Sequence, residues 1–442
     1  MEGQGKELMY RFSSITSLVA FGMLIAGPTQ AELRVGTAKV DITPPAGVKM
    51  YGYGARGSNV STGVHDRLYA KALVLADRTQ TAAWVTMDLG YVDTRLTKDI
   101  HAAISKVLGF DDVFLSSSHT HSGPRFEQNF PNSTHPWTQD LRQKITSAVI
   151  EASEALLPAH LGIGWGEVNF GHNRRHIRDD GTVEMFWENR TGIPTSPVDK
   201  SVAVVAINTP AGEPIATLIN LAIHPVVLGP ENLEYSADFP GAMMETVERK
   251  VGGLAMFLQG AAGDINPFWD KTPLRDGAYT QMERMGKIIG DEVIRVRKQL
   301  SLTTVESITL STKHVGVAPR WDLNDPEIRA GIRPDYLERF EREGKAEIKT
   351  ILIGSDLALV SFPGEFFVEH GLRLKRESVV RNTLFVGYTN GHLGYFPTIK
   401  AAAQGGYGAD SSTIVEVGAG EHLVNLALVN LGYLSGQLKP TP

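Results

Sequence analysis

The sequence contains no cysteine among its 442 residues. Disulfide bonds therefore cannot stabilise the fold, and both thiolate metal sites and cysteine nucleophiles are excluded. Histidine, aspartate, glutamate and tyrosine remain as the strong candidate ligands for a metal ion. With 42% hydrophobic and 21% charged residues, the chain has the composition of a folded protein whose stability comes from a sizeable apolar core.

Blocks of basic residues are also lacking. The formal net charge is -6, the isoelectric point is near 6.1, and the lysines and arginines are scattered along the chain. A nucleic-acid-binding protein usually gathers basic residues into a patch or stripe. The charge pattern therefore predicts that nucleic acid is not a partner.

Long apolar runs are lacking outside the N-terminal segment. There, the apolar run 15–26 follows two basic residues and precedes Ala31, which ends a small-residue cleavage site. This is the pattern of a secretory signal peptide over residues 1–31. The alternative, a short membrane anchor, is disfavoured because about 12 apolar residues are fewer than the roughly 20 that span a bilayer core. We expect residues 32–442 to form the mature, exported protein, either periplasmic or secreted.

The rest of the chain alternates short apolar runs with amphipathic segments. Such alternation predicts an α/β fold in which mixed β-sheets are layered with helices. Strands are predicted at 33–42, 70–76, 82–88, 113–116, 161–165, 201–208, 214–223, 254–259, 305–317 and 349–362. Helices are predicted at 94–108, 136–156, 237–251 and 281–300, with a solvated helical excursion at 320–345. Because neither a repeat nor a low-complexity linker interrupts this pattern, we expect one catalytic unit.

Two histidines follow the predicted strand 113–116. His119 and His121 lie two residues apart in a serine-rich segment that ends in a Gly-Pro turn. In an extended segment, both rings would leave the backbone on the same face. Open α/β sheets place their pockets beyond the carboxyl ends of strands. The pair is therefore a candidate for metal binding, although surface pairs of this kind are common.

Two further strands also run into groups that can bind metals. The strand 214–223 leads directly to His224, and the apolar run 357–362 leads through a Pro-Gly turn to Glu365. Taken singly, His224 fits a hydrogen-bonded core histidine and Glu365 fits a turn carboxylate. The functional interpretation depends on these groups lying close together in space.

Several motifs resemble the neutral ceramidase family. Residues 119–124 read His-Thr-His-Ser-Gly-Pro, which matches a hallmark of that family. The other matching segments, in the family's order, are 35–44, 63–70, 173–174, 222–224, 236–238, 263–267, 363–365 and 390–395. The resemblance covers nearly the whole mature chain. It implies a ceramidase-like catalytic domain, and the chain ends before the C-terminal β-sandwich that larger members carry.

The resemblance also implies a zinc site and a reaction. The four ligands would be His119, His224, Glu365 and Tyr407, and Asp238 would orient His224 through its second ring nitrogen. Two imidazoles and a carboxylate leave a coordination position for a water whose pKa falls to about 7. The implied reaction is hydrolysis of an amide bond in a lipid-like N-acyl substrate, with peripheral membrane contact.

Four other residues would serve the reaction in this resemblance: His121, Arg174, Asn266 and Tyr395. His121 would steady an oxyanion or move a proton, and Arg174 would bind a polar or anionic part of the substrate. Asn266 stands where the family carries a serine before a proline. Because an amide can donate a hydrogen bond but cannot give up a proton as a hydroxyl can, any role that needs the serine hydroxyl is excluded.

Three alternatives remain open from the sequence. An amidohydrolase barrel would carry the His-x-His pair on the first of eight parallel strands. A carbohydrate-active lyase or esterase on the same metal scaffold would bind an acidic sugar, and an exported binding protein would keep the scaffold without catalysis. An apolar groove for an acyl chain would involve Tyr51, Tyr53, Phe126, Phe130 and Trp137. A basic cleft for an acidic sugar would involve Arg174, Arg175 and Arg178.

Overall fold

The structure is a computed structural model that describes residues 33–125, 136–332, 337–338, 340–341 and 344–439. The predicted signal peptide lies outside the described residues, and so do Phe126 and Phe130. Within the described residues, no helix combines the length and the apolar character needed to cross a membrane.

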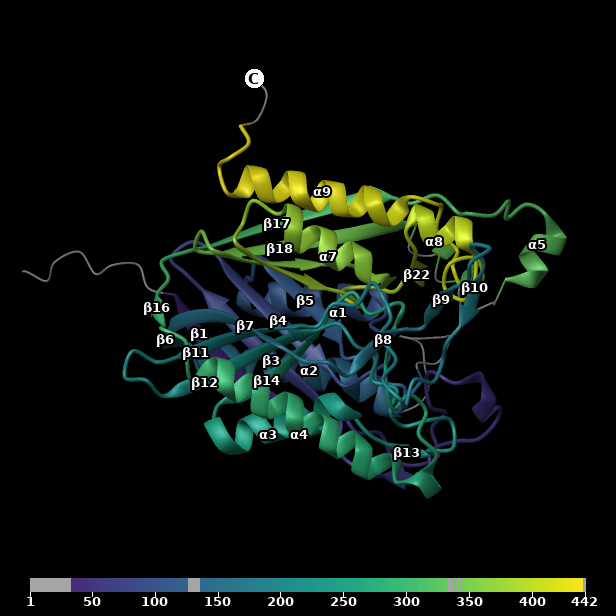
Figure 1. The fold of residues 1–442 in the computed structure, drawn as a ribbon. Helices are drawn as coiled ribbons and strands as arrows, with labels where there is room; N and C mark the ends of the chain where they lie inside the picture. Colours follow the sequence, from purple (N-terminus) through teal and green to yellow (C-terminus); the bar gives the residue numbers. More distant parts are fainter. Residues whose placement is uncertain (1–32, 126–135, 333–336, 339, 342–343, 440–442) are drawn as a thin grey trace, which may run out of the picture. The chain divides into compact units, whose positions relative to one another are not determined.

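Three main sheets form the framework (Figure 1). The first has the order β5-β4-β3-β1-β6 and consists of β1 (Arg34–Asp41), β3 (Tyr69–Ala76), β4 (Thr81–Met87), β5 (Asp112–Ser117) and β6 (Leu157–Pro158). The second has the order β14-β12-β11-β7-β16 and consists of β7 (His160–Glu167), β11 (Ser201–Asn208), β12 (Pro214–Leu221), β14 (Leu254–Gln259) and β16 (Thr303–Thr304). The third has the order β17-β18-β19-β21 and consists of β17 (Ile308–Gly316), β18 (Lys345–Ile353), β19 (Leu357–Ser361) and β21 (Asn382–Val386).

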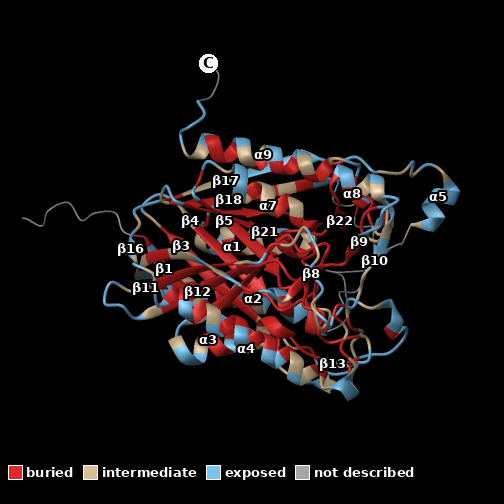
Figure 2. Cartoon of the chain, in the orientation of Figure 1, coloured by how far each residue is buried: buried red, intermediate tan, exposed pale blue. Residues whose placement is uncertain are grey.

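All three sheets bury one face in a shared apolar core. Trp84 of β4, Leu218 of β12 and Leu359 of β19 belong to this core. Helices cover the outer faces (Figure 1): α1 (Thr94–Leu108) and α2 (Pro136–Glu154) on the first sheet, α3 (Phe239–Val251) and α4 (Ala278–Arg297) on the second, α7 (Val368–Glu377) and α9 (Ala419–Leu434) on the third. Most strands of the three sheets are buried, except β16 and most of β17, and the helices are exposed on their outer sides (Figure 2). The predicted α/β class is confirmed.

Short elements connect this framework and surround the strand ends. They are η1 (Gly54–Arg56), β2 (Gly63–Val64), β8 (Gly171–Asn173), β9 (Arg175–Ile177), β10 (Val183–Met185), β13 (Glu234–Tyr235), β15 (Ile265–Pro267), η2 (Leu274–Asp276), α5 (Pro326–Gly331), β20 (Glu365–Phe366), β22 (Tyr395–Phe396) and α8 (Ile399–Gln404). The short strands pair as β2·β13, β8·β15, β9·β10 and β20·β22.

Helix α1 has the predicted bounds, and its sequence explains why. Asp93 caps its first turn by accepting a backbone N–H, and Leu96 and Ile100 lie four residues apart on the buried face. Gly109 ends the helix in the left-handed conformation, with φ of 68°, which glycine adopts at little cost. Local signals at both ends and one apolar stripe therefore define this helix completely.

Two predictions differ from the structure. The predicted strand 349–362 is a hairpin of β18 and β19 that turns at Gly354, whose φ is 59°. Because both strands are largely buried, the apolar sequence continues through most of the segment and does not indicate the turn between them. The amidohydrolase barrel is wrong, because the described residues form three separate mixed sheets in which the parallel pairs β4·β5, β12·β14 and β19·β21 stand beside antiparallel ones.

Candidate metal centre

The three predicted ligands from strand ends come together in the structure. β5, β12 and β19 end two to four residues before His119, His224 and Glu365, and each strand belongs to a different sheet. Glu365 Oε2 lies 3.4 Å from His119 Nε2 and 3.3 Å from His224 Nε2. All three side chains are buried. The carboxyl ends of strands from three sheets thus deliver two imidazoles and a carboxylate to one point.

The outer ring nitrogens of both histidines are held by backbone carbonyls. His119 Nδ1 lies 2.5 Å from the carbonyl oxygen of Gly90, and His224 Nδ1 lies 3.1 Å from that of Ile265. A carbonyl can only accept, so Nδ1 carries the proton and Nε2 keeps its lone pair towards Glu365. This tautomer is the one that binds a metal through Nε2.

The protonation states at the centre also suit a divalent ion. Burial lowers the pKa of His224 to about 4. Burial alone would raise the pKa of the Glu365 carboxyl, but its interactions with His119 first, and then with His224 and His392, hold the pKa well below its ordinary value. His224 Nε2 and Glu365 Oε2 are buried without a hydrogen-bond partner among the described residues. A neutral imidazole and an ionised carboxylate are the states in which these groups bind metals.

His121 joins this group, although not through an extended backbone as predicted. His119 has a positive φ of 67°, so the chain turns there instead of continuing β5. His121 Nε2 nevertheless lies 3.3 Å from His119 Nε2, and ligand nitrogens of these two residues and His224 lie within 4.8 Å of one another. Burial, together with the neighbouring His119 and His224, lowers the pKa of His121 well below its ordinary value. His121 is therefore a neutral base beside the centre and a further candidate ligand.

The glycine-rich loop after Met50 packs directly on His121. A Cβ at Gly52 would come within 2.4 Å of the His121 ring, so the loop requires glycine there. Buried Arg56, which the sequence interpretation missed, donates to the carbonyls of Tyr51 and His121 at 2.6 and 2.7 Å. The Tyr53 ring centroid lies 5.0 Å from that of His121. The loop thus lies beside the site, as expected from the sequence.

His392 is a second residue that the sequence interpretation missed. Its Nε2 lies 3.4 Å from Oε1 of Glu365, the oxygen that faces away from the other two histidines. The loop that carries it is anchored on β5, because Asn390 Oδ1 accepts the N–H of Leu115 and the N–H of Asn390 donates to the Leu115 carbonyl. The apolar run of β21, which precedes this loop, was the signal available in the sequence.

Arg174 forms a second cluster beside the centre. Its Nη1 donates to Oδ1 of Asn266 at 3.1 Å, and its Nη2 donates to the carbonyl of Gly263 at 2.6 Å and to the Tyr395 hydroxyl at 3.1 Å. Asn266 Nδ2 in turn donates to Asp270 at 2.7 Å. Both ends of the Asn266 amide are therefore engaged, and this residue positions the Arg174 guanidinium.

The two candidate tyrosines occupy different places. Tyr395 in β22 pairs in register with Glu365 in β20, and paired residues of adjacent strands project from the same face. The Tyr407 ring lies 5.5 Å from that of Tyr395 and 5.4 Å from that of Trp187, with the Arg174 guanidinium 5.2 Å from its centroid. Tyr395 is the tyrosine that the backbone places next to Glu365, and metal ligation by Tyr407 stays a prediction.

Asp238 does not orient His224, so that expectation is wrong. Its two carboxylate oxygens accept the backbone N–H groups of Leu228 and Phe239, the second at the start of α3. The Ile265 carbonyl takes the place beside the His224 ring that was expected for Asp238. Burial raises the pKa of Asp238 to about 7.

The residues predicted for substrate recognition are dispersed. Arg175 donates to backbone carbonyls of residues 401 and 405, and exposed Arg178 pairs with Glu184 at 3.2 Å, so neither joins Arg174 in one basic cleft. Trp137 is buried in the core beneath the first sheet and donates to the carbonyl of residue 42. The expected acidic-sugar cleft is therefore not formed by these three arginines.

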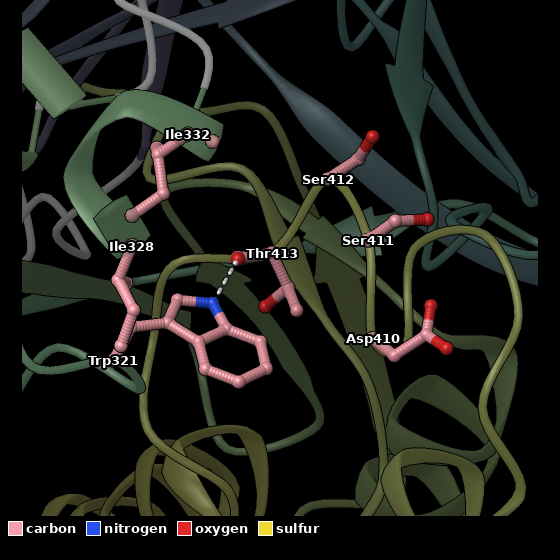
Figure 3. A pocket seen from close by; sticks show the side chains of 8 residues that line it. Trp321, Ile328, Ile332, Asp410, Ser411, Ser412 and Thr413 are labelled. Carbon is pink, nitrogen blue, oxygen red and sulfur yellow. Dashed lines mark hydrogen bonds between the residues drawn. The ribbon is translucent and has the colours of Figure 1, made fainter.

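A cavity of about 390 Å³ lies beside residues 410–413, which follow Tyr407 in the sequence (Figure 3). It is lined by Trp321, Ile328, Gly331, Ile332, Asp410, Ser411, Ser412 and Thr413. The Trp321 indole donates to the Thr413 carbonyl at 3.4 Å, and the backbone of Ser411 pairs with that of Tyr407. One wall is apolar and the other carries hydroxyls and a carboxylate, so the cavity suits an amphiphilic group.

Comparison with known proteins agrees with this geometry. The neutral ceramidase A of Dictyostelium discoideum is 24% identical over 62% of this chain and 42% of its own length. The neutral ceramidase of Pseudomonas aeruginosa is 26% identical over 58% of this chain and 41% of its own length. The chain thus spans less than half of the length of these curated relatives.

Solved structures show the same fold. The crystal structure of neutral ceramidase from Pseudomonas aeruginosa superposes with a TM-score of 0.73 and 21% identity, covering 93% of this chain and 76% of that one. A ceramidase structure complexed with C2 gives a TM-score of 0.74 and 20% identity over the same shares. The family model described as "Neutral/alkaline non-lysosomal ceramidase, N-terminal" matches residues 33–273. The chain therefore belongs to the neutral/alkaline non-lysosomal ceramidase family.

Proposed function

We propose that this protein is an exported zinc-dependent hydrolase that cleaves the amide bond of an N-acyl, ceramide-like substrate. The observation that supports it most directly is the convergence of His119, His224 and Glu365, whose inward atoms are buried at one point. Family membership supports a hydrolase acting on ceramide-like lipids, since the curated relatives are named neutral ceramidases. Export rests on the signal-peptide pattern of residues 1–31.

His119, His224 and Glu365 would hold the zinc ion, with Tyr395 or Tyr407 as the fourth ligand. Two imidazoles and a carboxylate are a ligand set of catalytic zinc sites, and they leave a coordination position for water. When bound, zinc acts as a Lewis acid and lowers the pKa of a water molecule to about 7.

The remaining residues have roles that follow from their protonation and contacts. His121 is neutral and lies against His119, so it can accept a proton from the attacking water and return it to the departing amine. Arg174 keeps its charge and is fixed by Gly263, Asn266 and Tyr395. Such a preorganised cation can bind the polar part of the substrate or stabilise negative charge that develops on it.

The substrate class follows from the surroundings of the centre. Tyr51 and Tyr53 place aromatic rings against His121, on the side where we propose that the acyl chain enters. The amphiphilic cavity beside residues 410–413 is the place we propose for the polar end of the substrate. A lipid-like substrate of this kind would bring the protein into peripheral contact with membranes.

A substrate panel tests this proposal. Metal-free and zinc-loaded protein are incubated with N-acyl amides, esters and uronic-acid oligosaccharides, and products are measured by mass spectrometry. We expect cleavage of the amides by the zinc-loaded protein alone. Cleavage of the oligosaccharides alone would overturn the substrate class and favour the carbohydrate-active alternative.

The ligand set is tested separately with His119→Ala. This variant should lose stoichiometric zinc and more than about 10³-fold of the activity, because zinc supplies the acidified water. His422→Ala, on the exposed side of α9, is the matched control and should keep both. Zinc retained at full stoichiometry in His119→Ala would show that the ligands are misassigned.

A further inference from the structure

Tyr388 has an unusual backbone conformation beside the metal centre. It lies two residues after the end of β21 and has a positive φ of 53°. Glycine and asparagine occupy this region readily, whereas a residue with a bulky side chain is strained there. Residues held in such conformations cluster at functional sites.

The hydroxyl of Tyr388 is also unusual. The side chain is fully buried, and its hydroxyl has no hydrogen-bond partner among the described residues. A buried tyrosine normally finds one: the hydroxyl of Tyr235, equally buried, accepts from Ser61 at 2.7 Å. Leaving a buried hydroxyl without a hydrogen-bond partner destabilises the folded protein. In the free protein, Tyr388 therefore destabilises the fold in two independent ways: through its backbone conformation and through its unpaired hydroxyl.

The ring of Tyr388 lies against the predicted zinc ligands. Its centroid is 4.2 Å from that of His119, with the two planes only 27° apart, and 6.2 Å from that of His392. Both histidines contact the Glu365 carboxylate from opposite oxygens. The unpartnered hydroxyl of Tyr388 thus belongs to the same buried region as the unpartnered Glu365 Oε2 and His224 Nε2.

We propose that Tyr388 is a further catalytic residue, whose hydroxyl donates a hydrogen bond to the carbonyl oxygen of the substrate at the centre. This inference rests on the proposed amide hydrolysis. A tyrosine hydroxyl, with an ordinary pKa of about 10, is a neutral donor at pH 7. It stabilises the negative charge that develops on that oxygen during attack, and no proton is transferred from it. The bond formed with substrate offsets the cost of the unpaired hydroxyl.

Tyr388→Phe removes only the hydroxyl and gives a distinctive combination of results. We expect kcat to fall by about 10²-fold, because one preorganised donor to a developing oxyanion contributes about 10²–10³. KM and zinc stoichiometry should stay near the values of the unaltered protein. The melting temperature of the metal-free variant should be equal or higher, since the unpaired hydroxyl is gone. A purely structural tyrosine would show the reverse.

Tyr235→Phe is the matched control. Its hydroxyl is buried and hydrogen-bonded to Ser61, and it contacts none of the predicted ligands. This variant should have a lower melting temperature and unchanged kcat.

Two outcomes would overturn the role of Tyr388: an unchanged kcat in Tyr388→Phe, or a loss of kcat accompanied by loss of zinc and of thermal stability. If the unaltered protein hydrolyses no N-acyl amide, the proposed function fails. If it does and Tyr388→Phe is equally active, only the present inference fails.

Discussion

The metal centre and the Arg174 cluster are adjacent, but their polar atoms are satisfied to different degrees. At the centre, His224 Nε2 and Glu365 Oε2 face inward and find no hydrogen-bond partner in the part of the chain that the structure describes. In the cluster, both Nη atoms of Arg174 donate to defined acceptors, whereas its Nε has no hydrogen-bond partner among the described residues. Buried polar groups are normally paired, so the unpaired set is the one arranged for a ligand from outside the chain. In the cluster, hydrogen bonds within the chain hold the Arg174 guanidinium in place before any ligand binds.

The two regions are joined through Tyr395. Its hydroxyl accepts from Arg174, and its backbone pairs with that of Glu365. Metal loading and substrate positioning should therefore be separable by substitution, although they share one short strand pair. The first two of the three predictions that follow test this separation, and the third concerns a group outside both regions.

The largest effect is expected in the Arg174 cluster. Arg174→Lys keeps the positive charge but loses the planar fork that reaches Gly263, Asn266 and Tyr395 together. We expect kcat/KM to fall about 10²-fold, by analogy with removal of one preorganised donor, while zinc affinity is unchanged. Arg178→Lys, at an exposed position, is the control and should behave like the unaltered protein. Loss of zinc from Arg174→Lys would show that the two regions are not separable.

A smaller effect is expected from His392, and it concerns zinc affinity instead of kcat/KM. His392→Ala removes the contact that holds Oε1 of Glu365, so zinc affinity should fall about 10- to 100-fold, the range for groups that orient a metal ligand. His392→Gln restores a donor and should recover part of that affinity. Chelator competition measures both variants. Equal affinities in the alanine variant and the unaltered protein would mean that Glu365 is held by other contacts.

The smallest effect concerns pH and a group outside both regions. Burial raises the pKa of Asp238 to about 7 in the folded protein, above its ordinary 3.8. The folded state therefore binds more protons than the unfolded state, and stability from this group is lost as pH rises through about 7. Between pH 6.5 and 8.5, the free energy of unfolding of the metal-free protein should fall by about 1 kcal/mol. Denaturant titrations at these pH values measure it.

Asp238→Asn provides the comparison for this pH dependence. It has no titrating carboxyl, so the decrease between pH 6.5 and 8.5 should disappear even if its absolute stability is lower. A variant that keeps the full pH dependence would assign the effect to another buried acid.

The strand ends could be predicted from sequence because their signals are local. His224 directly follows a long apolar run, and Glu365 follows another through a Pro-Gly turn. The local sequence therefore identifies both residues as candidate ligands. The bounds of α1 were predictable for the same reason, since a cap, a stripe and a glycine all lie within it. The prediction that these strand ends meet depended on the resemblance, because no local sequence pattern indicates which sheets pack together.

The residues that were missed depend on tertiary contacts. Arg56 is embedded among carbonyls from segments far along the chain, and Tyr388 and His392 lie on a loop whose path is set by left-handed residues. The apolar run of β21 places Tyr388 and His392 after a strand, but it does not show that their side chains contact the metal centre. The expected pairing of Asp238 with His224 was wrong for a similar reason. The backbone carbonyl of Ile265 contacts Nδ1 of His224 instead, and every residue has such a carbonyl, so the sequence does not indicate which one it will be.

Because the centre takes its ligands from beyond the strand ends of all three main sheets, the full set of His119, His224 and Glu365 cannot form in a partial product of synthesis that ends before Glu365. A nascent chain exposes His119 and His224 more than a hundred residues before Glu365 emerges. Binding of the ion by all three ligands would thus require that the sheet containing β19 has already packed against the other two. A fragment confined to the family-matched residues 33–273 would lack that carboxylate altogether.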